Sequence, residues 1–504
     1  MTRKRPLEMI AMACLVALFV AVRMWHLTDS CLWFDEIFSV HAAEQPWGQI
    51  LNFVAADLVH PPLFYIFLKL WIAIGGESII WLRIFPVVFS VVSIFPLVSL
   101  LRELKLNTRV QLICLFLLAF NGILLRHSQV VRMYSLLMCF GLFSMWLFAR
   151  YFFKGKNFIP LVIVNILLVY THYFGWLVVG SEVSAILIFQ RIKWRRITVM
   201  LAVVFVSFTP WIYAVWSAAK TSPGLAQNIG RTPRPGVLDL TILALNLVEP
   251  FYSPATTIDP ISLYSISIPL LLITILVVGM YLFEHKRFDE TEKRVAYLLG
   301  LFVVFPVIAA FVASWILPHS VWGSRHLIAI FAPLAILIAI ALTKIPAPKL
   351  RIAFSTIFVL FVGYAFALAL QRPGLQPSWC AWQPFAVQAA NERLAKIYVF
   401  EDLIGYHFWF ALEHNETRPV VAKIRNIEGV REDLAFFLPR AFDGVKTIDI
   451  SEVEEQSVWI AYRASRIDVQ QQPLKSFIDR GYKMSASEVF VAQGENAFLV
   501  LLEK

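Results

Sequence analysis

Two adjacent carboxylates stand among aromatic residues shortly after the first apolar stretch of the chain, in the run Trp33-Phe34-Asp35-Glu36. Neighbouring side chains point in different directions on a helix or a strand, so Asp35 and Glu36 cannot face each other as an acid/base pair. As candidate catalytic residues, one would face the substrate and the other the protein. Asp35 could act as a general base that takes a proton from an attacking hydroxyl or amine. Alternatively, Asp35 could cap a helix that begins near Ile37, because aspartate is a favoured N-cap residue.

A second polar group follows at Asp57 and His60, just before two prolines and an aromatic-rich segment that contains Tyr65. Residues three positions apart lie on one face of a helix. Together with Asp35, this pair could bind a divalent cation or act on a phosphate group. The alternative is a turn whose polar groups satisfy the backbone before the next helix.

The composition predicts that a membrane surrounds these residues. Of the 504 residues, 59% are hydrophobic and only 15% are charged. Repeated apolar stretches are long enough to cross ~30 Å of hydrocarbon. The net charge of +10 does not indicate a nucleic-acid partner, since the basic residues lie in short clusters between apolar stretches, where they set orientation. The sequence contains no glycine-rich phosphate-binding loop, and we expect no cofactor other than the divalent cation considered above.

We expect a mainly α-helical, polytopic bundle of about eleven spans. The loops on one side of this bundle each carry three or four Lys or Arg residues, which places the N-terminus inside. Residues 62–74 are apolar but too short to span, and we expect them to form an interfacial helix of the first outer loop. The predicted spans are residues 9–25, 79–101, 110–125, 132–153, 158–170, 175–190, 197–217, 263–283, 295–317, 327–343 and 351–370.

Several arginines fall at outer ends of spans, against this orientation bias. A phosphate near the membrane surface is a natural partner for arginine, although snorkelling to lipid head groups is an alternative. His172 lies in an uncharged outer loop and alone is a weak signal, for which packing in the core is the simpler explanation. The candidate substrate-binding residues are Asp57, His60, Tyr65, Arg83, Arg126, Arg132, Tyr134, His172 and Arg325.

Residues 371–504 differ in composition from the rest. Short β-branched or aromatic runs at 396–400, 457–462 and 497–502 alternate with helical patterns at 432–438 and 474–480. We therefore expect two domains: a transmembrane catalytic domain of residues 1–370 and a small α/β domain of residues 371–504 outside the membrane. The five cysteines have no zinc-binding spacing, and a disulfide between Cys31 and Cys380 is conceivable.

The order of these motifs resembles that of polytopic GT-C glycosyltransferases, in the family 39-like branch that contains protein O-mannosyltransferases and lipid A aminoarabinose transferases. The resemblance covers most of residues 1–345. Two features differ: the aminoarabinose transferases have Lys-Pro-Pro where this chain has His60-Pro61-Pro62, and the O-mannosyltransferases carry a β-trefoil insertion that is missing here. The matching segments are 33–36, 57–65, 76–77, 82–86, 129–137, 171–174 and 324–327.

The resemblance implies an inverting glycosyltransferase that takes a sugar from a polyprenyl-phosphate donor. The acceptor would be a lipid, a glycan or a protein, and Asp35 would be the base, with Arg132 and Arg325 binding the donor phosphate. The family also implies a multi-pass protein, which we place in a bacterial inner membrane with the active site and C-terminal domain on the extracytoplasmic side. The alternative is a lipid or sugar-lipid flippase, which would more often carry ionisable residues within its spans.

Overall fold

The computed structural model describes residues 4–221, 232–251, 260–283, 289–371, 376–392, 396–413, 419–430, 438–439, 442–492 and 494–504. Its backbone contacts divide the chain into two compact units. The first unit comprises the N-terminal residues up to Leu27 and the long stretch from Trp47 to residue 371, without residues 222–231. The second comprises residues 28–46 and the C-terminal part of the chain. The segment that carries Asp35 therefore groups with the C-terminal residues.

The first unit is helical, and its described residues include seven helical segments that are long and apolar enough to cross a membrane. All eleven predicted spans coincide with apolar helices, which confirms the predicted fold class. Four of the spans fall on shorter apolar helices (α7, α10, α11 and η3 with α17), and the span at 79–101 consists of two consecutive helices. The helices of this unit are α1 (Lys4–Met24), α3 (Ile50–Asp57), α4 (Leu63–Gly75), α5 (Ile79–Val92), α6 (Ile94–Glu103), α7 (Thr108–Phe120), α8 (Gly122–His127), α9 (Tyr134–Lys154), α10 (Phe158–Thr171), α11 (Gly175–Phe189), η1 (Arg191–Lys193), α12 (Trp194–Thr221), α14 (Val237–Val248), α15 (Pro260–Phe283), α16 (Glu290–Ile316), η3 (Ile328–Ile330), α17 (Phe331–Lys344) and α18 (Pro348–Gln371).

Local sequence explains several helix ends. The Asn107 side chain accepts a hydrogen bond from the Val110 N–H at the start of α7, and Asp289 does the same for Glu292 at the start of α16. The apolar segment at 62–74 is helical, as predicted, and forms α4. Helix α14 was not predicted, because the sequence interpretation assigned residues 218–262 to an outer loop.

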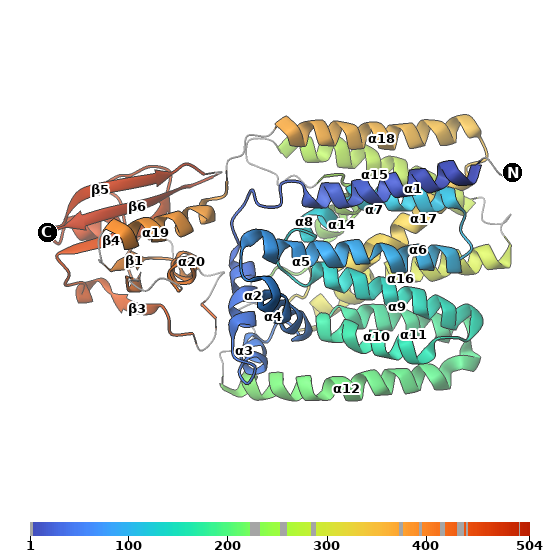
Figure 1. Ribbon diagram of the computed structural model, residues 1–504, viewed down its shortest axis with the longest axis horizontal. Helices are drawn as coiled ribbons and strands as arrows, with labels where there is room; N and C mark the ends of the chain where they lie inside the picture. The colour runs from blue at the N-terminus through green and yellow to red at the C-terminus, as the bar shows by residue number, and fades with distance from the viewer. Residues whose placement is uncertain are drawn as a thin grey trace. The chain divides into compact units, whose positions relative to one another are not determined.

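Helices α9, α10 and α11 lie side by side (Figure 1) and enclose a small polar network. Ser144 contacts Asn165 Oδ1 at 2.6 Å and Glu182 Oε1 at 2.5 Å. Asn165 Nδ2 donates to Glu182 Oε2 at 2.6 Å, and all three side chains are fully buried. The three residues come from three different helices. Their hydrogen bonds satisfy polar groups that hydrocarbon would leave unpaired, and so they connect the helices.

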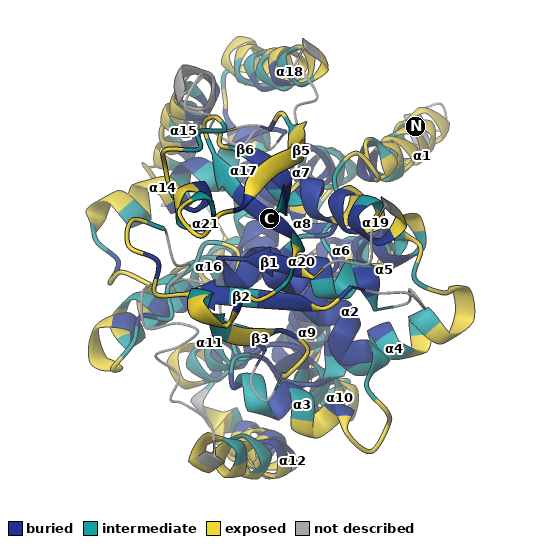
Figure 2. Cartoon of the chain, turned by 90° about the vertical axis from the view of Figure 1, so that its left-hand side faces the viewer, coloured by how far each residue is buried: buried dark blue, intermediate teal, exposed yellow. Residues whose placement is uncertain are grey.

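The second unit contains a six-stranded sheet with the order β3-β2-β1-β4-β6-β5, in which β3, β2, β1 and β4 are parallel and β6 runs antiparallel to its two neighbours. Strand β1 is buried, whereas β5 is exposed along almost its whole length (Figure 2). The strands are β1 (Ile397–Val399), β2 (Val421–Arg425), β3 (Lys446–Asp449), β4 (Ser457–Ala464), β5 (Lys483–Phe490) and β6 (Asn496–Glu503), and the helices are α2 (Phe34–Glu44), η4 (Ser378–Ala381), α19 (Trp382–Glu392), α20 (Asp402–Leu412), η5 (Ile450–Glu452) and α21 (Leu474–Ile478).

This unit confirms the predicted α/β character of the tail. The three predicted strands correspond to β1, β4 and β6, and the helical pattern at 474–480 corresponds to α21. Of the helical pattern predicted at 432–438, residues 432–437 lie outside the described residues. One face of the sheet packs against Phe477 and Tyr482, which are both buried.

Candidate active site

Five of the predicted site residues meet in one buried cluster of the first unit. Asp57 ends α3, and His60 lies in the short connection before α4. Arg132 and Tyr134 lie at the start of α9, and His172 lies between α10 and α11. His60, Arg132, Tyr134 and His172 are each at most 7% exposed. Helix ends and connections thus bring together side chains that lie far apart in the sequence.

A chain of contacts links three of these residues. Asp57 Oδ2 lies 3.7 Å from His60 Nδ1, and His60 Nε2 lies 3.3 Å from Arg132 Nη2. A guanidinium can only donate, so His60 must accept at Nε2 and carry its proton on Nδ1, facing the Asp57 carboxylate. Asp57 therefore favours the His60 tautomer that fixes the direction of the Arg132 guanidinium.

His172 presents a donor to the same cluster. The Phe174 backbone N–H donates to His172 Nδ1 at 3.1 Å, so the neutral ring carries its proton on Nε2. Burial is the main cause that lowers the pKa of His172 well below its usual value, with further contributions from His326, His60 and two arginines. No hydrogen-bond partner of Nε2 is found among the described residues, although the side chain is only 3% exposed. The buried Nε2–H is therefore available to an acceptor that enters the cluster.

Aromatic contacts extend the cluster to two further histidines. The rings of His60 and His172 are 5.5 Å apart, and those of His172 and His326 are 5.3 Å apart. Tyr134 lies 4.5 Å from His127, ring centre to ring centre. The Tyr134 hydroxyl and His127 Nδ1 also have no hydrogen-bond partner among the described residues.

The charge around the cluster favours an anion. Burial lowers the pKa of His127 well below its usual value, and the next largest causes are the nearby charges of Arg126 and Arg325. Both arginines are exposed, whereas Arg132 is 5% exposed. A group of cationic and N–H donor side chains that is shielded from water suits a phosphate oxygen better than a cation.

Two glycines permit the close approach of the segments that carry these histidines. A Cβ on Gly175, which begins α11, would come within 2.7 Å of the Leu168 carbonyl oxygen. A Cβ on Gly323 would come within 2.9 Å of His326 Nδ1. Side chains at either position would therefore displace the connection that holds His172 or the His326 ring.

The second unit carries Asp35 in the first turn of α2, where it is half-buried. The N-cap is Trp33, and the Glu36 carboxylate accepts a hydrogen bond from the Trp33 N–H at 2.9 Å. The carboxylate that caps α2 is therefore Glu36, and the helix begins at Phe34 rather than near Ile37. This arrangement leaves the Asp35 carboxylate without a role in the cap.

Two further predicted residues, Arg83 and Tyr65, are buried in helices of the first unit. Arg83 is buried in α5 and donates to the Leu27 carbonyl at 2.8 Å, which ties α5 to the segment after α1. Tyr65 is fully buried in α4 beside Phe64. Among the described residues, no group of three or more His, Cys, Asp or Glu side chains could hold a metal ion, so a cation at Asp35, Asp57 and His60 stays a prediction.

Sequence reasoning did not include His127 and His326 among the site residues. Each directly follows a predicted arginine, Arg126 or Arg325, and this adjacency was the available signal. The backbone leaves the arginine of each pair exposed, whereas His127 is buried and His326 is half-buried, which only the fold reveals.

No protein-family model matches the sequence, and no match is found among curated proteins. Solved structures do match. ArnT from Cupriavidus metallidurans, crystallised with undecaprenyl phosphate, is 12% identical, with a TM-score of 0.60 over 97% of each chain. An oligosaccharyltransferase from Archaeoglobus fulgidus, in complex with Zn and sulfate, is 14% identical, with a TM-score of 0.50 over 81% of this chain and 62% of the other. The chain therefore has the fold of the GT-C membrane glycosyltransferases, as its motifs predicted.

Proposed function

We propose that this chain is a membrane glycosyltransferase that moves a sugar from a polyprenyl-phosphate donor to an extracytoplasmic lipid, glycan or protein acceptor, with inversion at the anomeric carbon. The observation that carries the proposal is the buried cluster of Arg132 and His172, which offers donors suited to a phosphate. The fold supports it, because a protein of the same fold was crystallised with undecaprenyl phosphate.

On the donor side, Arg132 and the His172 Nε2–H would bind phosphate oxygens. The bond between the anomeric carbon and the phosphate oxygen breaks during transfer, so negative charge grows on the departing phosphate. Fixed donors in a site shielded from water stabilise that charge without reorganisation. Asp57 and His60 would act through Arg132 by holding its guanidinium in place.

On the acceptor side, Asp35 would be the base. A hydroxyl or amine attacks the anomeric carbon, and its proton passes to the Asp35 carboxylate. The lipid phosphate is itself the leaving group, so the reaction needs positioning, charge neutralisation and the removal of one proton. This division of labour agrees with the sequence, which has no glycine-rich nucleotide-binding loop.

The test is to replace each carboxylate of the pair separately. Asp35→Asn should lower turnover by about 100- to 10,000-fold, because one general base is lost. Glu36→Gln is the matched control: the glutamine oxygen can still accept from the Trp33 N–H, so the cap persists and turnover should change little. Turnover is measured on purified protein with a polyprenyl-phosphate sugar, and near-normal turnover of Asp35→Asn would remove Asp35 from the base role.

The proposal also requires that Asp35 lies outside the cytoplasm. Its support is the distribution of basic residues among the loops. Cysteines introduced at the exposed Ser78 and Ser451 should react with an impermeant thiol reagent in spheroplasts, whereas one at the exposed Lys156 should react only after lysis. The reverse pattern would exclude an outward-facing transferase and favour the flippase alternative.

A further inference from the structure

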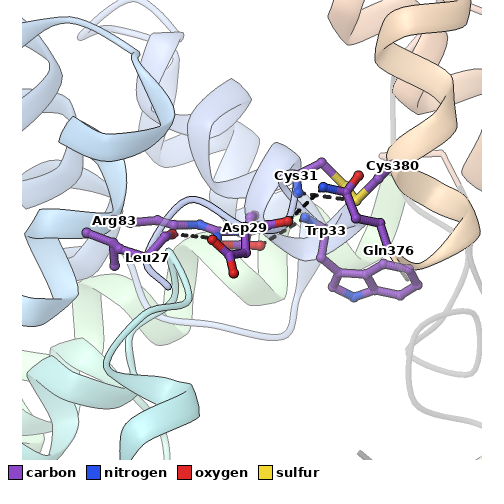
Figure 3. The surroundings of a disulfide bond; sticks show 8 residues. Leu27, Asp29, Cys31, Trp33, Arg83, Gln376 and Cys380 are labelled. Atoms are coloured by element: carbon purple, nitrogen blue, oxygen red, sulfur yellow. Dashed lines mark hydrogen bonds between the residues drawn. A yellow bond between two sulfur atoms is a disulfide. The ribbon is translucent and has the colours of Figure 1, made fainter. Parts of the chain in front are cut away.

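The segment just before α2, the helix that contains Asp35, is joined covalently to the C-terminal part of the chain. Cys31 and Cys380 form a disulfide across 349 residues of sequence, with their Cα atoms 5.3 Å apart (Figure 3). Beside it, the Gln376 side-chain amide donates to the Asp29 carbonyl at 2.8 Å. These two contacts hold the chain just before α2.

The far end of α2 is held by a second contact. His41 Nδ1 and the Tyr406 hydroxyl of α20 are hydrogen-bonded at 2.8 Å. His41 is 7% exposed and Tyr406 is fully buried. Burial lowers the pKa of His41 to about 4, so the ring is neutral near pH 7 and the contact does not depend on a charge there. The ring of Trp409, also from α20, lies 4.6 Å from that of His41.

Aromatic packing fills the space between these two anchors. The ring of Trp33 lies 4.4 Å from that of Trp379, edge to face, and the ring of Phe34 lies 5.1 Å from that of Tyr406. Edge-to-face pairs of this kind add to the stability that burial alone provides. Asp35 therefore follows two residues that both pack on the C-terminal segment, and it lies between the disulfide and the His41 contact.

We propose that the C-terminal residues 376–504 are a positioning element of the catalytic site: through Cys380, Gln376 and Tyr406 they hold α2 so that the Asp35 carboxylate is fixed for proton transfer. This inference rests on the proposed function. Each contact acts on the backbone or the packing of α2 and none touches the reacting atoms, so these residues are positioning residues. A disulfide restricts the motion of the segment that it closes, and an orienting contact matters for catalysis because small misplacements of a reacting group are costly.

The test uses the full-length protein in three forms: Tyr406→Phe, the double variant Cys31→Ser/Cys380→Ser, and the wild type reduced with dithiothreitol after folding. The reduced wild type keeps the test decisive even where the cysteine variant folds poorly, and mass spectrometry confirms that the disulfide is open. The matched control is Tyr398→Phe, which also loses one hydrogen bond in this unit, to Glu455 Oε2, but lies in β1.

Opening the disulfide should lower kcat by about 10- to 100-fold while the donor KM stays unchanged, because a misplaced base slows the chemical step without affecting phosphate binding. Tyr406→Phe should give a smaller loss of the same kind, and Tyr398→Phe should stay within about twofold of wild type. Amide exchange in α2 should quicken when the disulfide is open and in Tyr406→Phe, but not in Tyr398→Phe. Unchanged kcat and unchanged exchange in the reduced protein would overturn the inference.

A final arm separates this inference from the proposed function. In an Asp35→Asn background, opening the disulfide should cost little further activity, because the carboxylate that the disulfide and the Tyr406 contact position is already gone. If opening the disulfide lowered kcat as much in Asp35→Asn as in the wild type, the disulfide would serve general stability instead. Normal turnover of Asp35→Asn would show that Asp35 is not the base. If Asp35→Asn were inactive while the reduced wild type worked normally, only the positioning role of the C-terminal residues would be wrong.

Discussion

The first unit contains two buried polar clusters that differ in how completely they are paired. In the network of Ser144, Asn165 and Glu182, every side-chain oxygen and nitrogen lies within hydrogen-bond distance of another. In the cluster around Arg132, the His172 Nε2, the Tyr134 hydroxyl and the His127 Nδ1 have no partner among the described residues. These three side chains and the three of the Ser144 network are all buried, so exposure does not explain the difference.

The contrast separates a structural role from a binding role. A buried polar atom without a partner costs free energy, so proteins keep few of them. A complete network gains nothing from a ligand and serves to fix the helices that contribute to it. An incomplete network that carries positive charge gains hydrogen bonds and ion pairs when an anion enters. The fully paired triad therefore holds α9, α10 and α11 together, and the cluster around Arg132 has the incomplete pairing that the proposed phosphate would complete.

The largest expected effect is on donor affinity. Arg132→Ala should weaken donor binding by about 10- to 150-fold, the equivalent of one hydrogen bond to a charged group. The acceptor KM should change much less, and Arg132→Lys should recover part of the loss, since a point charge cannot reproduce the forked geometry. Binding of the donor by the purified protein measures this. Equal losses for donor and acceptor would mean that Arg132 is structural, and the contrast between the two clusters would fail.

The second prediction concerns the paired network. Ser144 has one hydroxyl hydrogen but two oxygen neighbours at 2.6 and 2.5 Å, so a protonated Glu182 is needed to complete the pairing. Glu182→Gln can supply both a donor and an acceptor and should be nearly neutral. Glu182→Ala should destabilise the fold by about 1–3 kcal/mol, because Ser144 and Asn165 lose a partner. Thermal unfolding in detergent measures the loss, and turnover per folded molecule should stay normal in both variants.

The sequence predicted the elements of the fold better than the site. The length of the apolar stretches and the basic loops between them were sufficient to find the eleven helical spans, because each span must be an apolar helix to lie in hydrocarbon. The α/β tail was recognisable from its alternating pattern. Helix α14 was missed because a helix of 12 residues within a long loop gives only a weak pattern. The grouping of residues 28–46 with the tail depends on contacts across more than 300 residues, which no local pattern reveals.

Within the candidate site, the arginines were predicted from their position at outer span ends, and Asp57 and His60 from their residue types and spacing. The capping role of Glu36 rather than Asp35 could not be predicted, because it depends on where α2 begins, and that differs by three residues from the prediction. His127 and His326 were missed because their burial is set by backbone direction. The Cys31–Cys380 disulfide was conceivable from the sequence, and the fold brings the two residues together.

The third prediction is a ligand-dependent loss of stability in acid. Burial lowers the pKa of His127 and His172, so above about pH 6.5 both residues are neutral in folded and unfolded protein alike. Below that pH the unfolded chain takes up protons first, and stability should fall by up to about 1.4 kcal/mol per pH unit for each histidine. A bound phosphate favours the protonated rings, so undecaprenyl phosphate should reduce the loss.

Unfolding midpoints between pH 7.5 and pH 5, with and without undecaprenyl phosphate, measure this effect. His41 and His407 in the second unit, whose pKa values burial lowers to about 4, add an acid loss of their own, which the lipid should not change. His172→Gln should remove part of the lipid-sensitive loss. If undecaprenyl phosphate did not change the fall in unfolding midpoint at low pH, the lipid phosphate would not bind in the cluster.

The smallest expected effect is that of metal removal. A cation between Asp57 and His60 would have to replace the proton on His60 Nδ1, and it would lie on the ring whose Nε2 contacts the positively charged Arg132. We therefore expect a chelator to change turnover by less than about twofold, since like charges in a buried site repel strongly. The check is turnover after treatment with a chelator and after re-addition of Mg²⁺ or Mn²⁺, in wild type and in Asp57→Asn. If a cation restores lost activity in the wild type but not in Asp57→Asn, then Asp57 and His60 hold a metal, and the cluster around Arg132 is completed by a cation rather than by the donor phosphate alone.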